Sequence, residues 1–155
     1  MTVNLRLPIM RLPHGMDLPL PAYATSEAAG MDVAAAVDKP VILAAGERLA
    51  IPTGFVMAVP AGYEAQIRPR SGLALKHGVT VANAPGTIDS DYRGEVAILL
   101  VNLGDQDFTI TRGMRIAQMV VAPVTQVTPI ATDSLADTER GDAGFGSTGY
   151  NNDVK

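Results

Sequence analysis

Gly86-Thr87-Ile88-Asp89-Ser90-Asp91-Tyr92-Arg93-Gly94 is the stretch on which the interpretation of this sequence turns. An apolar, β-prone run lies on each side of it, at residues 79–84 and 95–101. Because the stretch itself is rich in turn formers, the whole segment predicts a β-hairpin with an elaborate tip. Two carboxylates, a tyrosine and an arginine crowd this tip. Turns are polar in any case, so the segment alone is compatible with a solvated turn or with a carboxylate base held beside an aromatic ring.

Composition sets the class of protein. The 155 residues are 47 % hydrophobic and 18 % charged, which is typical of one globular domain with a real core. The net charge of −4 argues against binding to a nucleic-acid backbone, which needs a basic face. A few local arginines would still suffice for one phosphorylated small molecule.

Residue types that are scarce exclude several kinds of site. The chain has no cysteine, so disulfides, a thiol nucleophile and thiolate metal ligands are excluded. Its two histidines, His14 and His77, are too few for a histidine-rich metal cage. No apolar run approaches the length of a membrane span and no signal pattern opens the chain, so we expect a cytoplasmic protein without membrane contact.

Short β-prone runs recur along the chain, separated by turns that use fifteen glycines and eleven prolines. Such regular spacing predicts a β-sandwich or barrel. Besides the two hairpin arms, the expected strands are residues 3–11, 41–43, 47–52, 55–59, 63–69, 107–111, 114–123 and 124–129, with a further run opening near Asp32.

One short helix is expected at residues 73–77, closed by Gly78, with Ser71 at the N-cap position. Arg70 and Ser71 beside free N–H groups of a helix start form an arrangement that suits phosphate. The alternative is a capped turn with an exposed arginine.

Four other polar residues stand out, and two of them, Asn83 and Gln118, have two interpretations each. Asp32 fits a strand-opening turn in which it bonds its own backbone. Asn83 either shapes a loop or reads a base edge with its amide. Gln118 is an amide in an apolar strand, so it is either a core cross-link or a ligand contact. His14 fits a solvated loop residue, because no partner lies near it in the sequence.

The chain changes character from Ala131 onward. Residues 132–139 are polar and weakly helical, and residues 140–149 contain four glycines and a single phenylalanine, Phe145. Such a segment fits a disordered tail. It equally fits a lid in which Phe145 stacks on a planar ring while Arg140, hydroxyls and glycine N–H groups meet phosphate.

Five segments in this order closely resemble the five motifs of the homotrimeric deoxyuridine triphosphate nucleotidohydrolases (dUTPases). They are residues 29–33 (AGMDV), 70–74 (RSGLA), 86–94 (GTIDSDYRG), 115–119 (RIAQM) and 140–149 (RGDAGFGSTG). The resemblance spans nearly the whole chain. Val33 stands where leucine is frequent and Ala143 where glycine is frequent, and neither departure removes a reactive group.

The resemblance implies an all-β jelly-roll (β-clip-like) protomer with one short helix and a flexible, glycine-rich C-terminal tail. Residues 1–135 would form the β domain and residues 136–155 its lid. Three protomers would form a homotrimer with shared active sites. The reaction would convert dUTP and water to dUMP and pyrophosphate, which limits uracil incorporation into DNA and supplies dUMP for dTMP synthesis.

The resemblance also implies roles for particular residues. The hairpin from Asn83 through Ala97 would hold uracil, and Tyr92 would pack under the deoxyribose and block a ribose 2′-hydroxyl. Phe145 would cover the base, and the tail would close over the phosphates from another subunit. The full implied set for substrate is Arg70, Ser71, Gly72, Asn83, Gly86, Thr87, Ile88, Asp89, Tyr92, Ala97, Gln118, Arg140, Phe145, Gly146, Ser147 and Thr148.

The implied chemistry is attack of water at the α-phosphorus. Asp89 would deprotonate the water, and Mg²⁺ chelated by the triphosphate would neutralise charge. No direct protein ligand to the metal is expected, although Asp32 could reach it through water. Asp91 lies two positions from Asp89 and would face the same way on an extended strand, so the choice of Asp89 as base depends on the resemblance.

Two other functions compete. A dCTP deaminase would share a similar trimeric fold, but the hairpin offers Asp89 near phosphate motifs and the complete tail fits triphosphate hydrolysis better. A non-catalytic binding or scaffold protein of the same fold would be expected to lack Asp89, Ser71 or the tail, and all are present.

Overall fold

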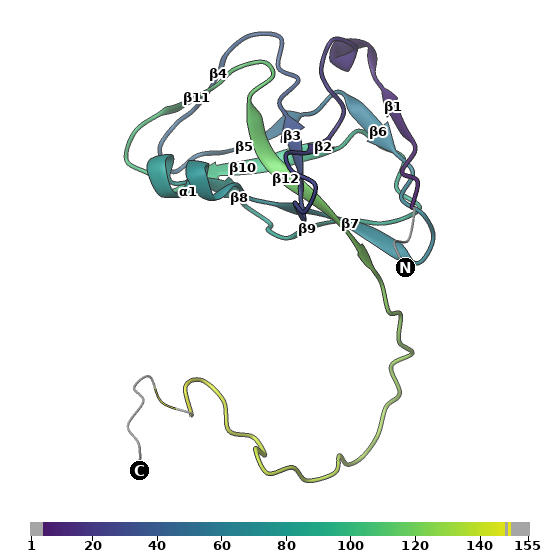
Figure 1. The fold of residues 1–155 in the computed structure, drawn as a ribbon. Coiled ribbons are helices and arrows are strands. Elements are labelled where there is room, and N and C mark those ends of the chain that lie inside the picture. The colour runs from purple at the N-terminus through teal and green to yellow at the C-terminus, as the bar shows by residue number, and fades with distance from the viewer. Residues whose placement is uncertain (1–4, 148, 150–155) are drawn as a thin grey trace. The chain divides into compact units, whose positions relative to one another are not determined.

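Antiparallel β-strands make up most of the regular secondary structure of this protein in a computed structural model that describes residues 5–147 and 149 (Figure 1). The chain divides into two units, Met1–Thr125 and Gln126–Lys155. Within the described residues, the helices and strands all lie in the first unit. In chain order they are β1 (Ile9–Arg11), η1 (a 3₁₀ turn, Pro13–Gly15), β2 (Ala22–Tyr23), β3 (Met31–Ala34), β4 (Val41–Leu43), β5 (Arg48–Pro52), β6 (Phe55–Met57), β7 (Tyr63–Arg68), α1 (Ser71–His77), β8 (Val79–Val81), β9 (Gly86–Ile88), β10 (Ala97–Asn102), β11 (Phe108–Ile110) and β12 (Arg115–Pro123).

Two sheets form the body of the first unit. The larger has the order β2-β3-β12-β7-β9 and the smaller the order β5-β10-β8, and the pairs β1-β6 and β11-β4 complete the pairing. Apart from β2 and β3, the paired strands are not consecutive in the chain, and every described pair is antiparallel. Antiparallel sheets with such crossovers and one short helix define a jelly roll, so the predicted fold class is confirmed.

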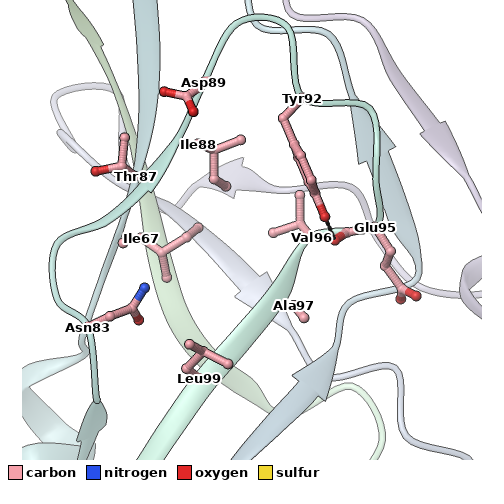
Figure 2. A pocket seen from close by; sticks show the side chains of 11 residues that line it. Ile67, Asn83, Thr87, Ile88, Asp89, Tyr92, Glu95, Val96, Ala97 and Leu99 are labelled. Carbon is pink, nitrogen blue, oxygen red and sulfur yellow. Dashed lines mark hydrogen bonds between the residues drawn. The ribbon is translucent and has the colours of Figure 1, made fainter.

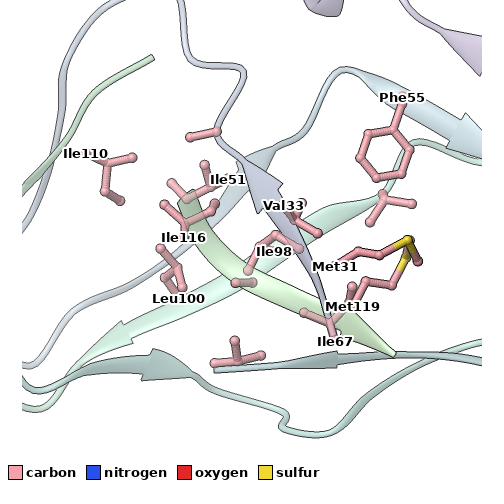
Figure 3. Packing of buried hydrophobic residues seen from close by; sticks show 14 of the residues in the cluster. Met31, Val33, Ile51, Phe55, Ile67, Ile98, Leu100, Ile110, Ile116 and Met119 are labelled. Atoms are coloured by element: carbon pink, nitrogen blue, oxygen red, sulfur yellow. The ribbon is translucent and has the colours of Figure 1, made fainter. Parts of the chain in front are cut away.

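The core lies between these sheets because their strands alternate buried and exposed residues. On β10, Ile98 and Leu100 are fully buried while Leu99 is exposed. On β12, Ile116 and Met119 are buried in the same cluster. Figure 3 shows these side chains pointing toward one another from the two strands. The outward face of β10 is therefore free to line a site.

The stretch at residues 86–94, called the deciding stretch below, folds differently from a simple hairpin tip. Its predicted arms do pair, because β8 lies antiparallel to β10 with Val81 opposite Leu100. The tip, however, begins with a strand of its own: β9 leaves the hairpin and pairs with β7, with Gly86 opposite Ile67. A turn-rich sequence was a poor guide here, since the partner strand lies about twenty residues earlier and supplies the hydrogen bonds.

Both ends of the predicted strand series were wrong. The first strand is confined to Ile9–Arg11, where β6 offers a partner. The predicted strand at residues 124–129 is absent among the described residues, and Val127 is 79 % exposed. Alternating apolar residues favour a strand only where a neighbour exists to pair with it. Conversely, β2 was not anticipated within the proline-rich loop.

The helix begins two residues earlier than expected. Arg70, with extended backbone angles, is the N-cap of α1, and Ser71 is already its first helical residue. Gly78 ends it at φ 68°, a left-handed conformation that glycine adopts without strain, as predicted. The start was missed because Gly72 weakens the helical pattern of the first turn.

The second unit has neither helix nor strand in its described part, residues 126–147 and 149. The weak helix expected over residues 132–139 is therefore wrong. Local turns do occur, and the Arg140 Nε–H donates to the Ala143 carbonyl at 3.0 Å. Phe145 is fully exposed within this unit and has φ 47°.

Candidate functional site

A cavity of about 240 Å³ opens where β9 and β10 diverge (Figure 2). Its lining combines an amide, a carboxylate, a phenol and a wall of aliphatic side chains. The lining residues are Ile67, Asn83, Gly86, Thr87, Ile88, Asp89, Tyr92, Glu95, Val96, Ala97 and Leu99. A small pocket that is mostly apolar with a few placed polar groups suits an organic ring.

The cavity exists because the chain crosses between the two sheets. β8 is bound to β10 in one sheet and β9 to β7 in the other, so residues 82–85 form the connection. Pro85 lacks an N–H group and cannot continue the ladder with β10. Between the separated strands, the outward residues Ala97 and Leu99 of β10 remain uncovered by β8 and line the cavity.

Gly86 is required for the position of the Asn83 amide. A Cβ atom added at Gly86 would lie 3.2 Å from Asn83 Nδ2 and 3.4 Å from the Cβ of Ile67. Both distances are at or below the ordinary contact range, so a larger residue would push the amide aside. The Asn83 side chain is exposed at the cavity wall, where its amide is available to a ligand.

The structure distinguishes the two carboxylates of the deciding stretch. Asp89 lines the cavity and Asp91 does not. The chain turns directly after Asp89, as the hydrogen bond from the Tyr92 N–H to the Asp89 carbonyl at 3.2 Å indicates. The chain is therefore not extended between Asp89 and Tyr92, so the alternation that would make the two carboxylates equivalent on an extended strand does not apply.

Tyr92 folds back along its own turn. Its hydroxyl donates to the main-chain carbonyl of Glu95 at 3.0 Å, the dashed line in Figure 2. A Cβ atom on Gly94 would lie 2.3 Å from this hydroxyl oxygen, so only glycine leaves room for it. The ring is 46 % exposed and stands beside the cavity.

The predicted phosphate residues lie around a second cavity of about 650 Å³ rather than the first. Arg70, Ser71, Gly72 and Gln118 all line it, together with Asp32 and Arg115. The first cavity contains seven of the other predicted residues: Asn83, Gly86, Thr87, Ile88, Asp89, Tyr92 and Ala97. One protomer thus holds two groups of predicted residues in two separate cavities, with no lining residue in common.

Asp32 is the electrostatic centre of the second cavity. Its Oδ1 lies 3.2 Å from Arg70 Nε, and its Oδ2 accepts a hydrogen bond from Arg115 Nη1 at 2.9 Å. Arg70 also donates to the Arg115 carbonyl at 3.0 Å. The expectation that Asp32 bonds its own backbone is wrong, because β12, paired with β3, supplies Arg115, and the N-cap of α1 supplies Arg70.

Gln118 makes the cross-link that was one of its two interpretations, and the ligand contact stays a prediction. Its Nε2 donates to the Pro69 carbonyl at 2.9 Å, which ties β12 to the segment before α1. Gly30 lies so close that an added Cβ would stand 2.6 Å from Gln118 Oε1. The same side chain lines the second cavity, so the amide is both a cross-link and part of the cavity wall.

The predicted tail residues are described only within their own unit. Arg140, Phe145, Gly146 and Ser147 are exposed there. Thr148 lies outside the described residues.

Four lining residues of the first cavity were missed by the sequence analysis: Ile67, Glu95, Val96 and Leu99. Leu99 shares a strand face with Ala97 by the period of two, a signal that was available. Ile67 could not be found, because its place depends on the unexpected pairing of β7 with β9.

His14 is not the unpartnered loop residue that was expected. Its Nε2 lies 2.7 Å from Glu95 Oε1, across 81 positions of sequence. Arg112 supports this turn by donating to the His14 carbonyl at 2.7 Å and to the Asp17 carboxylate. The hydrogen bond from Arg112 lowers the pKa of Asp17 below its ordinary value.

The described residues contain no group of three or more His, Cys, Asp or Glu side chains placed to hold a metal ion. No helix among them has both the length and the apolar character needed to span a bilayer.

Comparison with known proteins identifies the class to which this fold and this site belong. The dUTPase family model matches residues 16–149. A deoxyuridine 5′-triphosphate nucleotidohydrolase of Sinorhizobium medicae (strain WSM419) is 61 % identical over 145 residues, which are 92 % of this chain and 91 % of that protein. One from Rhizobium meliloti (strain 1021) is 60 % identical over the same shares of both chains.

Solved structures agree at the level of the fold. A mutant dUTPase of Staphylococcus bacteriophage 80alpha with dUpNHpp superposes with a TM-score of 0.83 at 24 % identity, over 94 % of this chain and 99 % of that one. A mutant dUTPase from phage phi11 of S. aureus, in which a structural Mg(II) ion is coordinated, gives a TM-score of 0.74 at 20 % identity, over 84 % of this chain and 98 % of that one. This chain belongs to the dUTPase family.

Proposed function

We propose that this protein is a dUTP diphosphatase that converts dUTP and water to dUMP and pyrophosphate, with water activated by Asp89 attacking the α-phosphorus. The observation that carries the proposal is the cavity between β9 and β10, which Asp89, Tyr92 and Asn83 all line. Family membership supports the substrate class.

Uracil would occupy the first cavity. The volume of this cavity, about 240 Å³, is below the range of roughly 300–1,000 Å³ that is common for pockets that hold a whole ligand. The cavity therefore suits a base and its sugar but not a triphosphate. The Asn83 amide can donate and accept at a base edge. The aliphatic wall formed by Ile67 and Leu99 would leave no room for the methyl group of thymine, and Tyr92 would exclude a ribose 2′-hydroxyl.

Asp89 would act as the general base. A carboxylate exposed at the cavity wall can hold a water molecule by hydrogen bonding and accept its proton as attack proceeds. Phosphoryl transfer otherwise asks for positioning and charge neutralisation, with no covalent intermediate.

The phosphates would be bound by the group around the second cavity. Arg70, Ser71 and Gly72 offer a guanidinium, a hydroxyl and backbone N–H groups, and Gln118 offers an amide. Because one protomer holds this group in a cavity separate from the base cavity, we propose that a homotrimer joins the two groups across subunits. Tail residues Arg140, Phe145, Gly146, Ser147 and Thr148 would close over the substrate of another subunit.

Mg²⁺ would enter as part of the substrate, chelated by the triphosphate, and would supply charge neutralisation. The donor set of this chain fits that arrangement, since both oxygens of Asp32 already contact arginines. Each oxygen keeps a second lone pair, so a water-mediated contact from Asp32 to the metal belongs to the proposal. A cytoplasmic location, compatible with the absence of cysteine, belongs to it as well.

Pyrophosphate release tests the proposal, measured with dUTP, dCTP, dTTP and UTP, with and without Mg²⁺. Asp89→Asn keeps the shape of the side chain and removes the base, so we expect kcat to fall by about 10²–10⁴-fold with nucleotide binding retained. Asp91→Asn is the matched control, because the same charge is removed two positions away, outside the cavity lining.

Each result has a defined meaning. Full activity of the Asp89→Asn variant would refute the assigned base. Ammonia release from dCTP would indicate the deaminase. Inactivity toward all four nucleotides, from a folded trimer, would leave the non-catalytic binding protein.

A further inference from the structure

The Glu95 carboxylate forms a junction that the proposed chemistry does not use. Its Oε1 accepts a hydrogen bond from the Gly54 N–H at 2.8 Å and lies 2.7 Å from His14 Nε2. The Glu95 side chain is 29 % exposed and that of His14 is 36 % exposed. A partly buried carboxylate with two partners from distant segments fixes its own residue in place.

The two partners of the Glu95 carboxylate, His14 and Gly54, lie on segments that pack against each other. η1 packs directly on the turn before β6, since a Cβ atom on Gly15 would lie 2.2 Å from the Gly54 carbonyl oxygen. The Leu12 N–H donates to that same oxygen at 2.8 Å. His14 therefore belongs to a turn whose backbone packs directly against the backbone at Gly54.

The residue after Glu95 is fixed to the same turn. The Val96 N–H donates to the Phe55 carbonyl at 3.0 Å, and the buried hydroxyl of Thr53 donates to the Val96 carbonyl at 2.5 Å. The peptide between Glu95 and Val96 is thus anchored by side chain and backbone together.

That anchored peptide carries the carbonyl that receives the Tyr92 hydroxyl. Tyr92 is otherwise an exposed side chain on a turn, and such side chains change rotamer easily. The path from His14 to the cavity is therefore continuous: His14 and Gly54 hold the Glu95 side chain, Glu95 presents its carbonyl, and the carbonyl holds the Tyr92 ring. In Figure 2 the Glu95 carboxylate points away from the cavity while the Tyr92 ring stands beside it.

We propose that Glu95 and His14 are positioning residues that hold the Tyr92 ring rigid and thereby set the discrimination of deoxyribose from ribose. The inference rests on the proposed function. A wall excludes a 2′-hydroxyl only if it cannot retreat, because selection by exclusion needs the wrong ligand to meet a clash. Loosening Tyr92 costs little for dUTP, which has no group there, and admits UTP.

The experiment compares kcat/KM for dUTP and UTP in the wild type, Glu95→Ala, Glu95→Gln, His14→Ala and Tyr92→Phe. We expect Glu95→Ala and Tyr92→Phe to raise the UTP-to-dUTP ratio about three- to tenfold, the change set by loss of one hydrogen bond. Glu95→Gln keeps an acceptor for the Gly54 N–H and should retain most of the discrimination. Combining Glu95→Ala with Tyr92→Phe should add little, since both act through one hydrogen bond: Tyr92→Phe removes its donor, and Glu95→Ala loosens the peptide that carries its acceptor.

Glu47→Ala is the matched control. The Glu47 carboxylate also accepts a backbone N–H, that of Ala44 at 3.2 Å, but it lies outside the cavity lining. We expect this variant to leave the ratio within twofold. A ratio equally unchanged in Glu95→Ala, or additive effects of Glu95→Ala and Tyr92→Phe, would overturn the inference.

A second measurement separates this inference from the proposed function. The NMR signals of the Tyr92 ring, in protein labelled at tyrosine, report its freedom without any turnover. We expect them to shift and sharpen in Glu95→Ala and to stay unchanged in Glu47→Ala. Identical Tyr92 signals in the wild type and Glu95→Ala would overturn the inference, whereas a wild type inactive toward dUTP would refute the proposed function.

Discussion

Asp32→Asn tests how the second cavity is organised. The aspartate carboxylate contacts Arg70 through one oxygen and Arg115 through the other, at 3.2 and 2.9 Å. Asparagine has nearly the same shape but no charge, and its NH₂ group would face one of the two guanidinium groups. The change therefore removes the attraction that holds Arg70 toward the proposed phosphate position while leaving the strand pairing of β3 intact.

The magnitude follows from exposure. The Arg115 side chain is 58 % exposed, so its pair with Asp32 contributes only about 0.2–1 kcal/mol. Arg70 and Asp32 are 30 % and 22 % exposed, so their pair is less screened and contributes about 1 kcal/mol more. A total of about 1–2 kcal/mol corresponds to a loss of about 5–30-fold in kcat/KM. Because Arg70 would bind ground state and transition state alike, we expect the loss in KM.

Steady-state pyrophosphate release over a range of dUTP and Mg²⁺ concentrations measures the predicted change in KM. If Asp32 positions Arg70, KM for dUTP rises and the Mg²⁺ concentration for half-maximal activity stays unchanged. Asp105→Asn is the control, since Asp105 is exposed and lies outside the second cavity. Equal kinetics of the two variants would refute the positioning argument. A shift in the Mg²⁺ requirement of Asp32→Asn alone would instead support a water-mediated contact to the metal.

Two further predictions concern stability. Asn102 is fully buried, and its side chain makes three hydrogen bonds with main-chain groups at 2.8–3.0 Å. Asn102→Ala should therefore lower the free energy of unfolding, measured by urea titration, by about 2–4 kcal/mol. A loss below about 0.5 kcal/mol would contradict the stabilising role of these hydrogen bonds. Arg112 lowers the pKa of Asp17 in the folded state, so this pair stabilises the protein above the ordinary value of 3.8 and the contribution is lost as pH falls through the lowered pKa. Asp17→Asn should therefore flatten the loss of thermal stability below about pH 4, and an unchanged acid profile would contradict the assignment.

The local sequence pattern predicted the positions of most strands and the end of the helix. Period-two alternation and turn residues located most strands to within one or two residues, and Gly78 correctly ended the helix. The failures at residues 124–129, at β9 and at His14 share a physical cause, because each depends on whether a segment distant in sequence supplies a partner. Residues 124–129 have a strand-like pattern but no paired neighbour among the described residues, and His14 found its partner 81 positions away.

The deciding stretch shows the same division within a few residues. Its residue types point to chemistry because the proposed ligand and reaction would require them: a carboxylate at position 89, an aromatic ring at position 92 and a glycine at position 86. Its first three residues form a strand because β7 hydrogen-bonds β9, and this pairing separates the tip from the hairpin. That displacement opens the cavity and turns the chain after Asp89, which separates Asp89 from Asp91 where alternation could not. The residue types of a site can therefore be specific while its geometry depends on a distant strand, here β7, that the motif itself does not contain.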